Sequence, residues 1–266
     1  MAIAILGAGV MGATLLSAFV RAGHPVDSVV VSDKVAERAG QVAAEHGVRA
    51  LDAASAVAEA DIIVLAVKPQ DMSTLLGEVS AGVRPEALVI SIAAGISTEF
   101  LEAHLPEQTS VVRAMPNTPA LVDQGMTALA RGRHCSQTHA DNAEALLGTV
   151  GSVVTLDEHH LDAVTALSGS GPAYIFYVVE AMVEAGVLLG LPRATASELV
   201  VQTCYGAATM LRDTGQHPTV LREQVSSPGG TSVAALRQLE DHKVRAAFMT
   251  AIEAAARRSK ELSQSD

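Results

Sequence analysis

The chain has 266 residues, 49% of them apolar and only 3% aromatic, so its core must be built from small and aliphatic side chains. The formal net charge of −11 argues against nucleic acid or an anionic membrane as the main partner, because both bind basic surfaces. The two cysteines, Cys135 and Cys204, match no metal-ligand spacing and are expected to be free thiols in a reducing compartment.

We expect a soluble cytoplasmic protein. The apolar residues 2–6 run directly into glycines, and no basic region precedes them, which argues against a signal peptide. The longest apolar run, residues 172–189, is interrupted by Glu180 and Glu184, which argues against a membrane span.

The N-terminal residues match a dinucleotide-binding fingerprint. Residues 2–6 predict a buried parallel strand, and a helical pattern follows the segment Gly7-Ala8-Gly9-Val10-Met11-Gly12. In this GxGxxG pattern, Gly7 permits the tight turn, Gly9 lets the backbone approach a pyrophosphate, and Gly12 allows the helix to pack closely on the strand. The strand before and the helix after favour dinucleotide binding over a structural glycine turn.

The second predicted strand, residues 29–31, ends at Ser32-Asp33-Lys34. Asp33 lies 21 residues after Gly12, where a carboxylate would bond the ribose hydroxyls of NAD. Lys34 and Arg38 would instead suit the 2′-phosphate of NADP, so the residues leave both cofactors open. The structural alternative for Asp33 is the N-cap of a helix over residues 34–46.

Strands and helices continue to alternate as far as Leu156. Lys68 follows a predicted strand and is either a cofactor contact or a solvated lysine. The turn Ala93-Ala94-Gly95 leaves room for a flat ring, and Asn117 is expected to point its amide above the sheet. The remaining predicted elements are strands within 61–69, 88–95, 111–115, 125–130 and 153–156 and a helix over 138–150. This alternation predicts a doubly wound, Rossmann-like α/β sheet.

The second half is predicted to be all helical. Residues 157–162 mix histidines with carboxylates, but neighbouring residues on a helix point in different directions, so we expect no metal and interpret Asp157 as an N-cap. Two long helices follow, and because both are apolar on more than one face they predict a subunit interface. The predicted order is a helix over 172–189, a helix from Pro192 to about 212, a polar connection to 224, and helices over 231–240 and about 242–262.

The turn before the helix at 231–240 is a candidate anion site. Pro228 fixes one backbone angle, Gly229 and Gly230 permit angles that side chains forbid, and Thr231 or Ser232 can cap the helix. Such a junction presents backbone N–H groups and hydroxyls that suit a carboxylate. An ordinary capped turn is equally compatible with these residue types.

Five motifs together resemble those of the pyrroline-5-carboxylate reductase family. They are GAGVMG at 7–12, LAVKP at 65–69, RAMPNTP at 113–119, LSGSGPAY at 167–174 and VSSPGGTSVAAL at 225–236. The resemblance covers nearly the whole chain, and the last motif is the most specific because other Rossmann dehydrogenases lack it.

The resemblance implies an enzyme that reduces L-Δ1-pyrroline-5-carboxylate to L-proline with NADPH or NADH, the last step of proline biosynthesis. It implies a dinucleotide-binding domain over 1–156 and a helical domain over 157–266 that dimerises and holds substrate, with dimers often forming rings. The partner subunit helps to supply the substrate loop, and the substrate lies between that loop and the nicotinamide.

The resemblance also assigns residues to roles. The cofactor residues would be Gly7, Ala8, Gly9, Val10, Met11, Gly12, Ser32, Asp33, Lys34, Ala66, Val67, Lys68, Pro69, Ala93, Ala94, Gly95 and Asn117. The substrate residues would be Val225, Ser227, Gly229, Gly230, Thr231 and Ser232. Two positions depart from the family: Ser232 stands where threonine is common, and Asp33 stands where NADP-preferring members have a neutral or basic residue.

The chemistry asks mainly for positioning, because a protonated cyclic imine accepts hydride readily. We expect the backbone N–H groups of Gly230 and Thr231 to bind the carboxylate and Ser232 to hydrogen-bond the ring nitrogen as the catalytic hydroxyl. The alternatives are a related two-domain reductase of other imines or 2-hydroxy acids, and a non-catalytic NAD(P)-binding regulator. Hydroxy-acid reductases of this class use a lysine from the helical domain, and this chain has none between Leu156 and His242.

Overall fold

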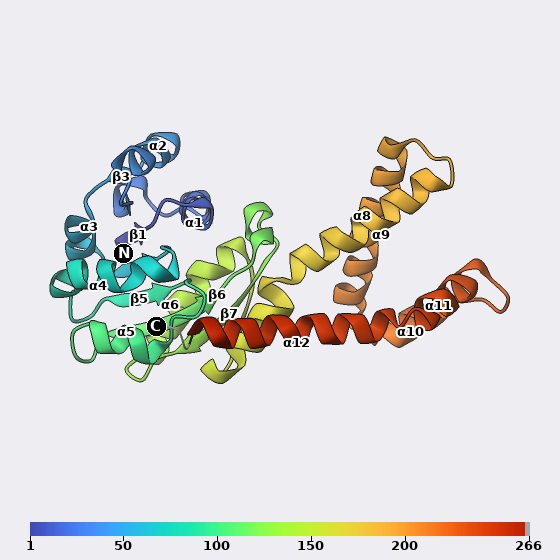
Figure 1. Ribbon diagram of the computed structural model, residues 1–266. Helices are drawn as coiled ribbons and strands as arrows, with labels where there is room; N and C mark the ends of the chain where they lie inside the picture. The colour runs from blue at the N-terminus through green and yellow to red at the C-terminus, as the bar shows by residue number, and fades with distance from the viewer. Residues whose placement is uncertain (264–266) are drawn as a thin grey trace. The chain divides into compact units, whose positions relative to one another are not determined.

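The computed structural model describes residues 1–263, and these form two compact units (Figure 1). The first unit comprises Met1–Ser170 together with the chain from Ala255 onward, and the second comprises Gly171–Ala254.

The first unit is built on one eight-stranded sheet with the strand order β3-β2-β1-β4-β5-β6-β7-β8. Its strands pair in parallel except β6 and β7, which are antiparallel. The strands are β1 Ile3–Leu6, β2 Val29–Ser32, β3 Arg49–Ala50, β4 Ile62–Leu65, β5 Leu88–Ser91, β6 Ser110–Met115, β7 Gly125–Arg131 and β8 Gly151–Thr155. The predicted doubly wound α/β fold is thus confirmed, with the chain reversing its direction of growth between β1 and β4.

Alternate residues of the central strands feed two separate cores, as strand geometry requires. Ile3 and Ile5 point to the core covered by α1 (Val10–Arg21), α2 (Ala36–His46) and α6 (Gln137–Leu147). Ala4 and Leu6 point to the core covered by α3 (Ala53–Glu59), α4 (Met72–Val79) and α5 (Thr98–His104). Both faces of the sheet are therefore buried, which explains why these strands are uniformly apolar.

Short turns connect these elements, and a helical segment leads out of the sheet after β8. The 3₁₀ turns are η1 Val26–Ser28, η2 Pro69–Asp71, η3 Ser80–Gly82, η4 Thr118–Val122, η5 Gly148–Val150 and η6 Glu158–His160. After η6 come α7 (Leu161–Val164) and η7 (Thr165–Gly169), which is π-helical.

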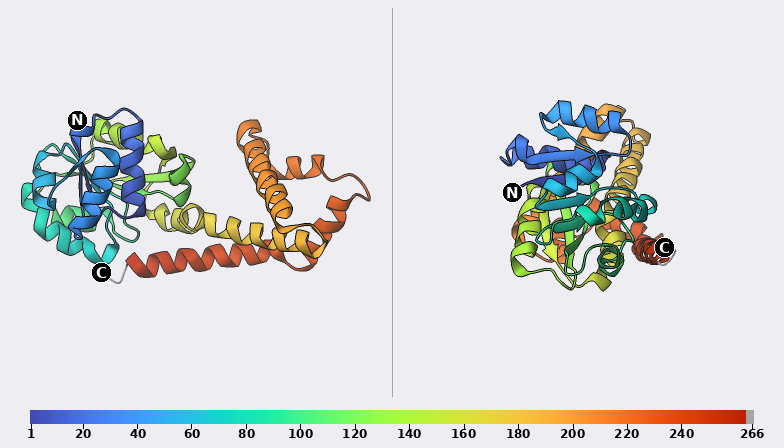
Figure 2. Two further views of the ribbon diagram at one scale, coloured as in Figure 1. Left: turned by 90° about the horizontal axis from the view of Figure 1, so that it is seen from above. Right: turned by 90° about the vertical axis from the view of Figure 1, so that its left-hand side faces the viewer.

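The second unit is helical and has little core of its own. It contains α8 Gly171–Leu188, α9 Arg193–Thr214, α10 Pro218–Gln224, α11 Thr231–Asp241 and the first part of α12 Val244–Ser263. The α8 and α9 helices pack against each other (Figure 2), with a Cβ on Gly186 coming within 2.9 Å of the Ala196 Cβ. Within residues 171–254, only Val183 and Ala196 are buried.

Large apolar side chains of this unit are instead exposed, among them Tyr177 at 74% and Leu188 at 88%. An apolar surface on this scale marks a protein or membrane contact. By length and composition alone, the helical run Glu158–Leu188 is apolar enough to cross a membrane. Core helices of soluble proteins have the same length and composition, so this helical run alone does not indicate a membrane protein.

Several predicted details were wrong. The helix expected over 34–46 begins at Ala36 with Val35 as its N-cap, so Asp33 is not the cap. The helix after the glycine pair begins at Thr231 with Gly230 as N-cap and no side-chain cap, so neither Thr231 nor Ser232 caps it. The connection expected between Arg212 and Gln224 contains α10, which has Pro218 in its first turn and is capped by His217 Nδ1 accepting from the Thr219 N–H.

Candidate active site

A crevice of about 850 Å³ opens at the carboxyl ends of β1 and β4. Strand order reverses here, and doubly wound sheets bind ligands at such a point. The crevice brings together eight predicted residues, namely Gly7, Gly9, Ser32, Asp33, Lys34, Ala66, Val67 and Lys68. It also contains Arg38, which was expected to suit a 2′-phosphate, and polar residues that were not predicted, among them Asp52, Asp71, Thr74 and Glu78.

The three glycines of the first loop differ in the space that the fold leaves for a side chain. Gly7 has φ +113°, and a Cβ there would lie 2.5 Å from the Ala66 carbonyl oxygen. A Cβ on Gly12 would lie 1.9 Å from the Gly7 carbonyl oxygen. A Cβ on Gly9 would meet nothing within 4 Å, and Gly9 is not in a left-handed conformation. Packing therefore explains Gly7 and Gly12, whereas the open space beside Gly9 fits a phosphate group that approaches the backbone.

The Asp33 carboxylate braces this loop. Its Oδ2 accepts the N–H of Ala8 at 2.8 Å, its Oδ1 accepts the N–H of Val35 at 2.9 Å, and Arg38 Nη1 lies 3.5 Å from Oδ1. The side chain is only 6% exposed. Both carboxylate oxygens are thus already engaged, which leaves them poorly placed to accept the two hydroxyls of a ribose.

Three basic residues, Lys34, Arg38 and Lys68, line the crevice. Lys34 Nζ donates to both carboxylate oxygens of Asp71 at 2.8 Å, Arg38 is exposed, and Lys68 is exposed immediately before η2.

Asp52, an acidic residue of the same crevice, is the N-cap of α3, where its Oδ1 accepts the Ser55 N–H at 2.9 Å. That hydrogen bond lowers the pKa of the Asp52 carboxyl.

The other predicted cofactor residues lie outside this crevice: Ala8, Val10, Met11, Gly12, Pro69, Ala93, Ala94, Gly95 and Asn117. The Asn117 amide was expected to point freely above the sheet, but it instead joins two segments of the chain. Its Nδ2 donates to the Ser168 carbonyl oxygen at 3.1 Å, and its Oδ1 accepts the Met126 N–H at 2.8 Å. Asn117 therefore fixes the turn that begins the LSGSGPAY motif.

Glu158 makes a connection that sequence reasoning missed. Its carboxylate accepts hydrogen bonds from the Thr98 N–H and hydroxyl at the start of α5, and from Arg113 Nη1 at 3.2 Å. Arg113 is a buried cation on β6, so Glu158 supplies its counter-charge. The result ties η6 to β6 and to the helix that follows the Ala93–Gly95 turn.

The glycine-paired loop of the second unit lies between α10 and α11. Gly229 has φ +69°, and the N–H of Gly230 donates to the Ser227 carbonyl oxygen at 3.0 Å. A Cβ on Gly230 would lie 2.7 Å from Ser227 Oγ, which can rotate away, and 3.0 Å from the Ser227 carbonyl oxygen, so a side chain here would crowd the turn. The Gly230 N–H is engaged within the turn and is therefore not the free carboxylate donor that was expected. Because no side chain caps α11, the backbone N–H groups of its first turn, from Thr231 onward, are available to an anion.

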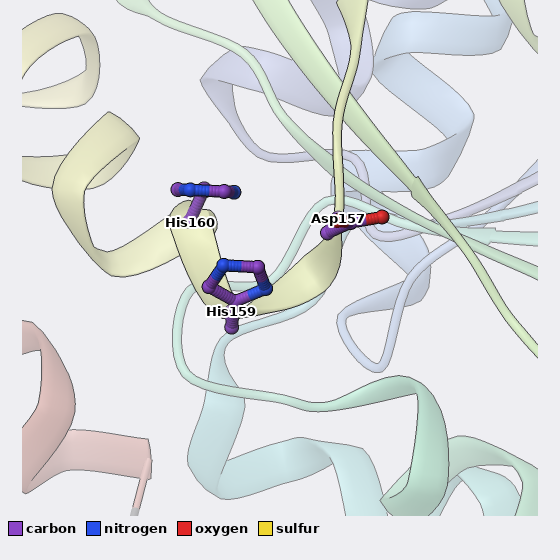
Figure 3. A group of neighbouring side chains, drawn as sticks. All are labelled: Asp157, His159 and His160. Atoms are coloured by element: carbon purple, nitrogen blue, oxygen red, sulfur yellow. The ribbon is translucent and has the colours of Figure 1, made fainter.

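The histidine cluster after β8 differs from expectation. The potential ligand atoms of Asp157, His159 and His160 lie within 4.8 Å of one another (Figure 3), although neighbours were expected to diverge. Asp157 occupies the N-cap position of η6, but its side chain makes no cap hydrogen bond. All three residues are exposed, and within residues 1–263 no hydrogen-bonding side chain orients either imidazole as protein metal sites require. We assign no metal to this cluster.

Comparison with known proteins extends these observations. A family model described as pyrroline-5-carboxylate reductase dimerisation matches residues 158–262, and one described as NADP oxidoreductase coenzyme F420-dependent matches residues 2–95. The pyrroline-5-carboxylate reductase of Corynebacterium melassecola is 43% identical over 98% of this chain and 98% of its own.

Two solved structures are similar over nearly their whole length. The pyrroline-5-carboxylate reductase from Coxiella burnetii matches with a TM-score of 0.92 at 36% identity, covering 98% of each chain. The Plasmodium falciparum pyrroline carboxylate reductase with NADP bound matches with a TM-score of 0.89 at 27% identity, covering 99% of this chain and 98% of that one.

The fold and the crevice define an NADP(H)-binding oxidoreductase with a Rossmann-like domain and a helical domain that self-associates. The chain belongs to the pyrroline-5-carboxylate reductase family. It reduces L-Δ1-pyrroline-5-carboxylate to L-proline by hydride transfer from NAD(P)H, the last step of proline biosynthesis. The exposed apolar helices of the second unit lie in the region that the dimerisation model matches.

Proposed function

We propose that the crevice at β1 and β4 holds the adenosine and pyrophosphate end of NADPH. The observation that carries this proposal is Gly9, whose missing side chain opens onto free space instead of onto the protein. The cofactor residues of the proposal are Gly7, Ala8, Gly9, Val10, Met11, Gly12, Ser32, Asp33, Lys34, Ala66, Val67, Lys68, Pro69, Ala93, Ala94, Gly95 and Asn117. Within this set, Ala8 and Asn117 act by holding neighbouring backbone, because the Ala8 N–H and the Asn117 amide already have protein partners.

The same geometry favours NADPH over NADH. The Asp33 carboxylate already accepts the N–H groups of Ala8 and Val35 and is only 6% exposed, which limits its access to the ribose hydroxyls of NAD. Lys34 and Arg38 line the same crevice and offer charge-assisted hydrogen bonds to a 2′-phosphate. Asp33 thus serves as a brace of the glycine loop, and the two cations set the preference.

The loop before α11 binds the substrate. The N–H group of Thr231 holds its carboxylate, and the positive end of α11 adds to the attraction. The Gly230 N–H, which was expected to share this role, already donates to the Ser227 carbonyl oxygen and so keeps the turn closed. Val225, Ser227 and Gly229 shape the turn that presents the Thr231 N–H, and Ser232 lies in the first turn of the helix, within the same anion-binding segment.

When bound, NADPH supplies the hydride. The chain fixes the imine carbon for attack by anchoring the carboxylate, and Ser232 orients the proton at the ring nitrogen, so that the carbon–nitrogen double bond becomes the amine of proline. The described residues supply no strong acid or base at this loop. Catalysis therefore depends on positioning and on a polar environment for the iminium charge.

Steady-state kinetics of Ser232 variants test this role. Ser232→Ala is expected to lower kcat/KM by about one to two powers of ten, the scale of one positioned proton-transfer group. Ser232→Thr keeps the hydroxyl and is expected to retain most of the activity. If Ser232→Ala has wild-type kinetics, the hydroxyl takes no part in proton delivery.

We also propose a cytoplasmic enzyme whose dimers assemble further into a ring, with residues 1–156 as the dinucleotide-binding domain and 157–266 as the dimerisation and substrate domain. The dimerisation match from residue 158 and the apolar surface of the second unit support this division. Light scattering of the purified protein, compared with the mass of 27.4 kDa per chain, distinguishes a dimer from a ring.

A further inference from the structure

The ion pair between Lys34 and Asp71 connects two loops of the cofactor crevice. Lys34 follows β2, and Asp71 is the last residue of η2, which follows β4. Lys34 Nζ is 2.8 Å from each carboxylate oxygen of Asp71, and both residues line the crevice. The pair therefore lies on the surface that faces the bound nucleotide.

The Asp71 side chain forms no hydrogen bond or ion pair in the described structure other than this one with Lys34. Asp71 occupies the N-cap position of α4, yet its side chain makes no cap hydrogen bond. The Lys34 side chain is 69% exposed and that of Asp71 is 32% exposed, and ion pairs exposed to this degree contribute little to folding. Because the ion pair is weak, Lys34 can leave Asp71 and bind an anion that carries more charge.

A 2′-phosphate is such a partner, because it carries up to two negative charges and three acceptor oxygens. To reach Lys34 it must displace the Asp71 carboxylate and then sit near that negative charge. We propose that Asp71 is a specificity-determining residue: it occupies Lys34 in the free protein and weakens the binding of 2′-phosphorylated nucleotides relative to nucleotides that lack this phosphate. The proposal rests on the assignment of the crevice to the adenosine end of the cofactor.

The experiment measures direct binding of two small nucleotides, adenosine 2′,5′-bisphosphate and 5′-AMP, by isothermal titration calorimetry at low salt. Asp71→Asn removes the charge and is expected to tighten the binding of the bisphosphate by about two- to fivefold, the factor that corresponds to one exposed ion pair. The affinity for 5′-AMP is expected to stay unchanged. In kinetics, the KM for NADPH should fall while kcat and the KM for NADH stay constant.

Glu78→Gln is the matched control, because it removes one negative charge from the same crevice and leaves the Lys34–Asp71 ion pair in place. It is expected to have a smaller effect than Asp71→Asn. In the Lys34→Ala background, Asp71→Asn should lose most of its effect, since the cation it liberates is gone. Raising the ionic strength should shrink the gain, as screening predicts.

The outcomes separate this inference from the site assignment. If the wild-type protein binds adenosine 2′,5′-bisphosphate and Asp71→Asn leaves its affinity unchanged, the inference is wrong and the crevice assignment stands. An equal gain from Glu78→Gln also overturns the role of Asp71. If neither nucleotide binds the wild-type protein, or if they bind and NADP⁺ does not displace them, the crevice assignment itself is wrong.

Discussion

Gly9→Ala and Gly12→Ala should have different effects: the first should weaken NADPH binding, and the second should lower the stability of the fold. The two glycines belong to one loop and receive the same added methyl group, but their surroundings differ. At Gly12 the new Cβ would lie 1.9 Å from the Gly7 carbonyl oxygen, so α1 must move away from β1. At Gly9 the new Cβ meets no protein atom within 4 Å, and the backbone, with φ −72°, already suits alanine.

The expected magnitudes follow from these contacts. Gly12→Ala should lower the free energy of unfolding by about 1–3 kcal/mol or more, the cost of forcing an extra carbon into packed structure. Gly9→Ala should change it by less than about 0.5 kcal/mol, because the loss of a favourable cap residue opposes the reduced entropy of the unfolded chain. Its Kd for NADPH should rise at least about tenfold, since the methyl group occupies the space proposed for the phosphate.

Urea unfolding of the apo protein, at one fixed subunit concentration because the protein self-associates, gives the stabilities. Titration with NADPH, followed by nicotinamide fluorescence, gives the affinities. Wild-type NADPH affinity in a folded Gly9→Ala variant would refute the placement of the pyrophosphate. A Gly12→Ala variant as stable as wild type would refute the packing argument.

Three further predictions concern the framework around the site. Glu158→Gln should cost about 1–3 kcal/mol of stability, because it leaves the buried Arg113 without its counter-charge, and urea unfolding at pH 7 measures this; an unchanged midpoint contradicts it. The Ala2 N–H and then Arg84 lower the pKa of the Asp61 carboxyl, so its stabilisation is present above the unfolded pKa of about 3.9 and is lost as pH falls through the lower folded value. Asp61→Asn should therefore lower the melting temperature at pH 7, by a few degrees at most because the group is partly exposed, and the difference from wild type should shrink below pH 4; a difference that grows with acidity contradicts the sign. Tyr177→Glu places a charge on the exposed apolar face of α8 and should shift the protein toward monomer in light scattering, and an unaltered mass would exclude Tyr177 from the interface.

The doubly wound sheet was predictable because its strands are apolar runs that end in recognisable turns. The edge strand β3 was not, since Arg49 and Ala50 are exposed and form a strand only by pairing with Val30 and Val31. The helix α10 was missed because its residues are mostly exposed and polar, although Pro218 in its first turn was an available signal.

The site was predictable in its motifs but not in its hydrogen bonds. The spacing from the glycine motif placed Asp33 at the end of β2. Its hydrogen bond to the Ala8 N–H, however, joins residues 25 positions apart, and no local sequence pattern predicts such a contact. The same holds for Asn117 with Ser168, and for Lys34 with Asp71. Each of these contacts depends on the packed sheet that brings separate loops to one edge.

A crystal structure of the enzyme with NADP⁺ and L-proline would locate both ligands at once and so test both proposed binding sites. We predict the pyrophosphate beside Gly9, the 2′-phosphate on Lys34 and Arg38, and the proline carboxylate on the Thr231 N–H at the start of α11. A complex with the cofactor away from the Gly7–Gly12 loop, or with the carboxylate away from the start of α11, would contradict the account.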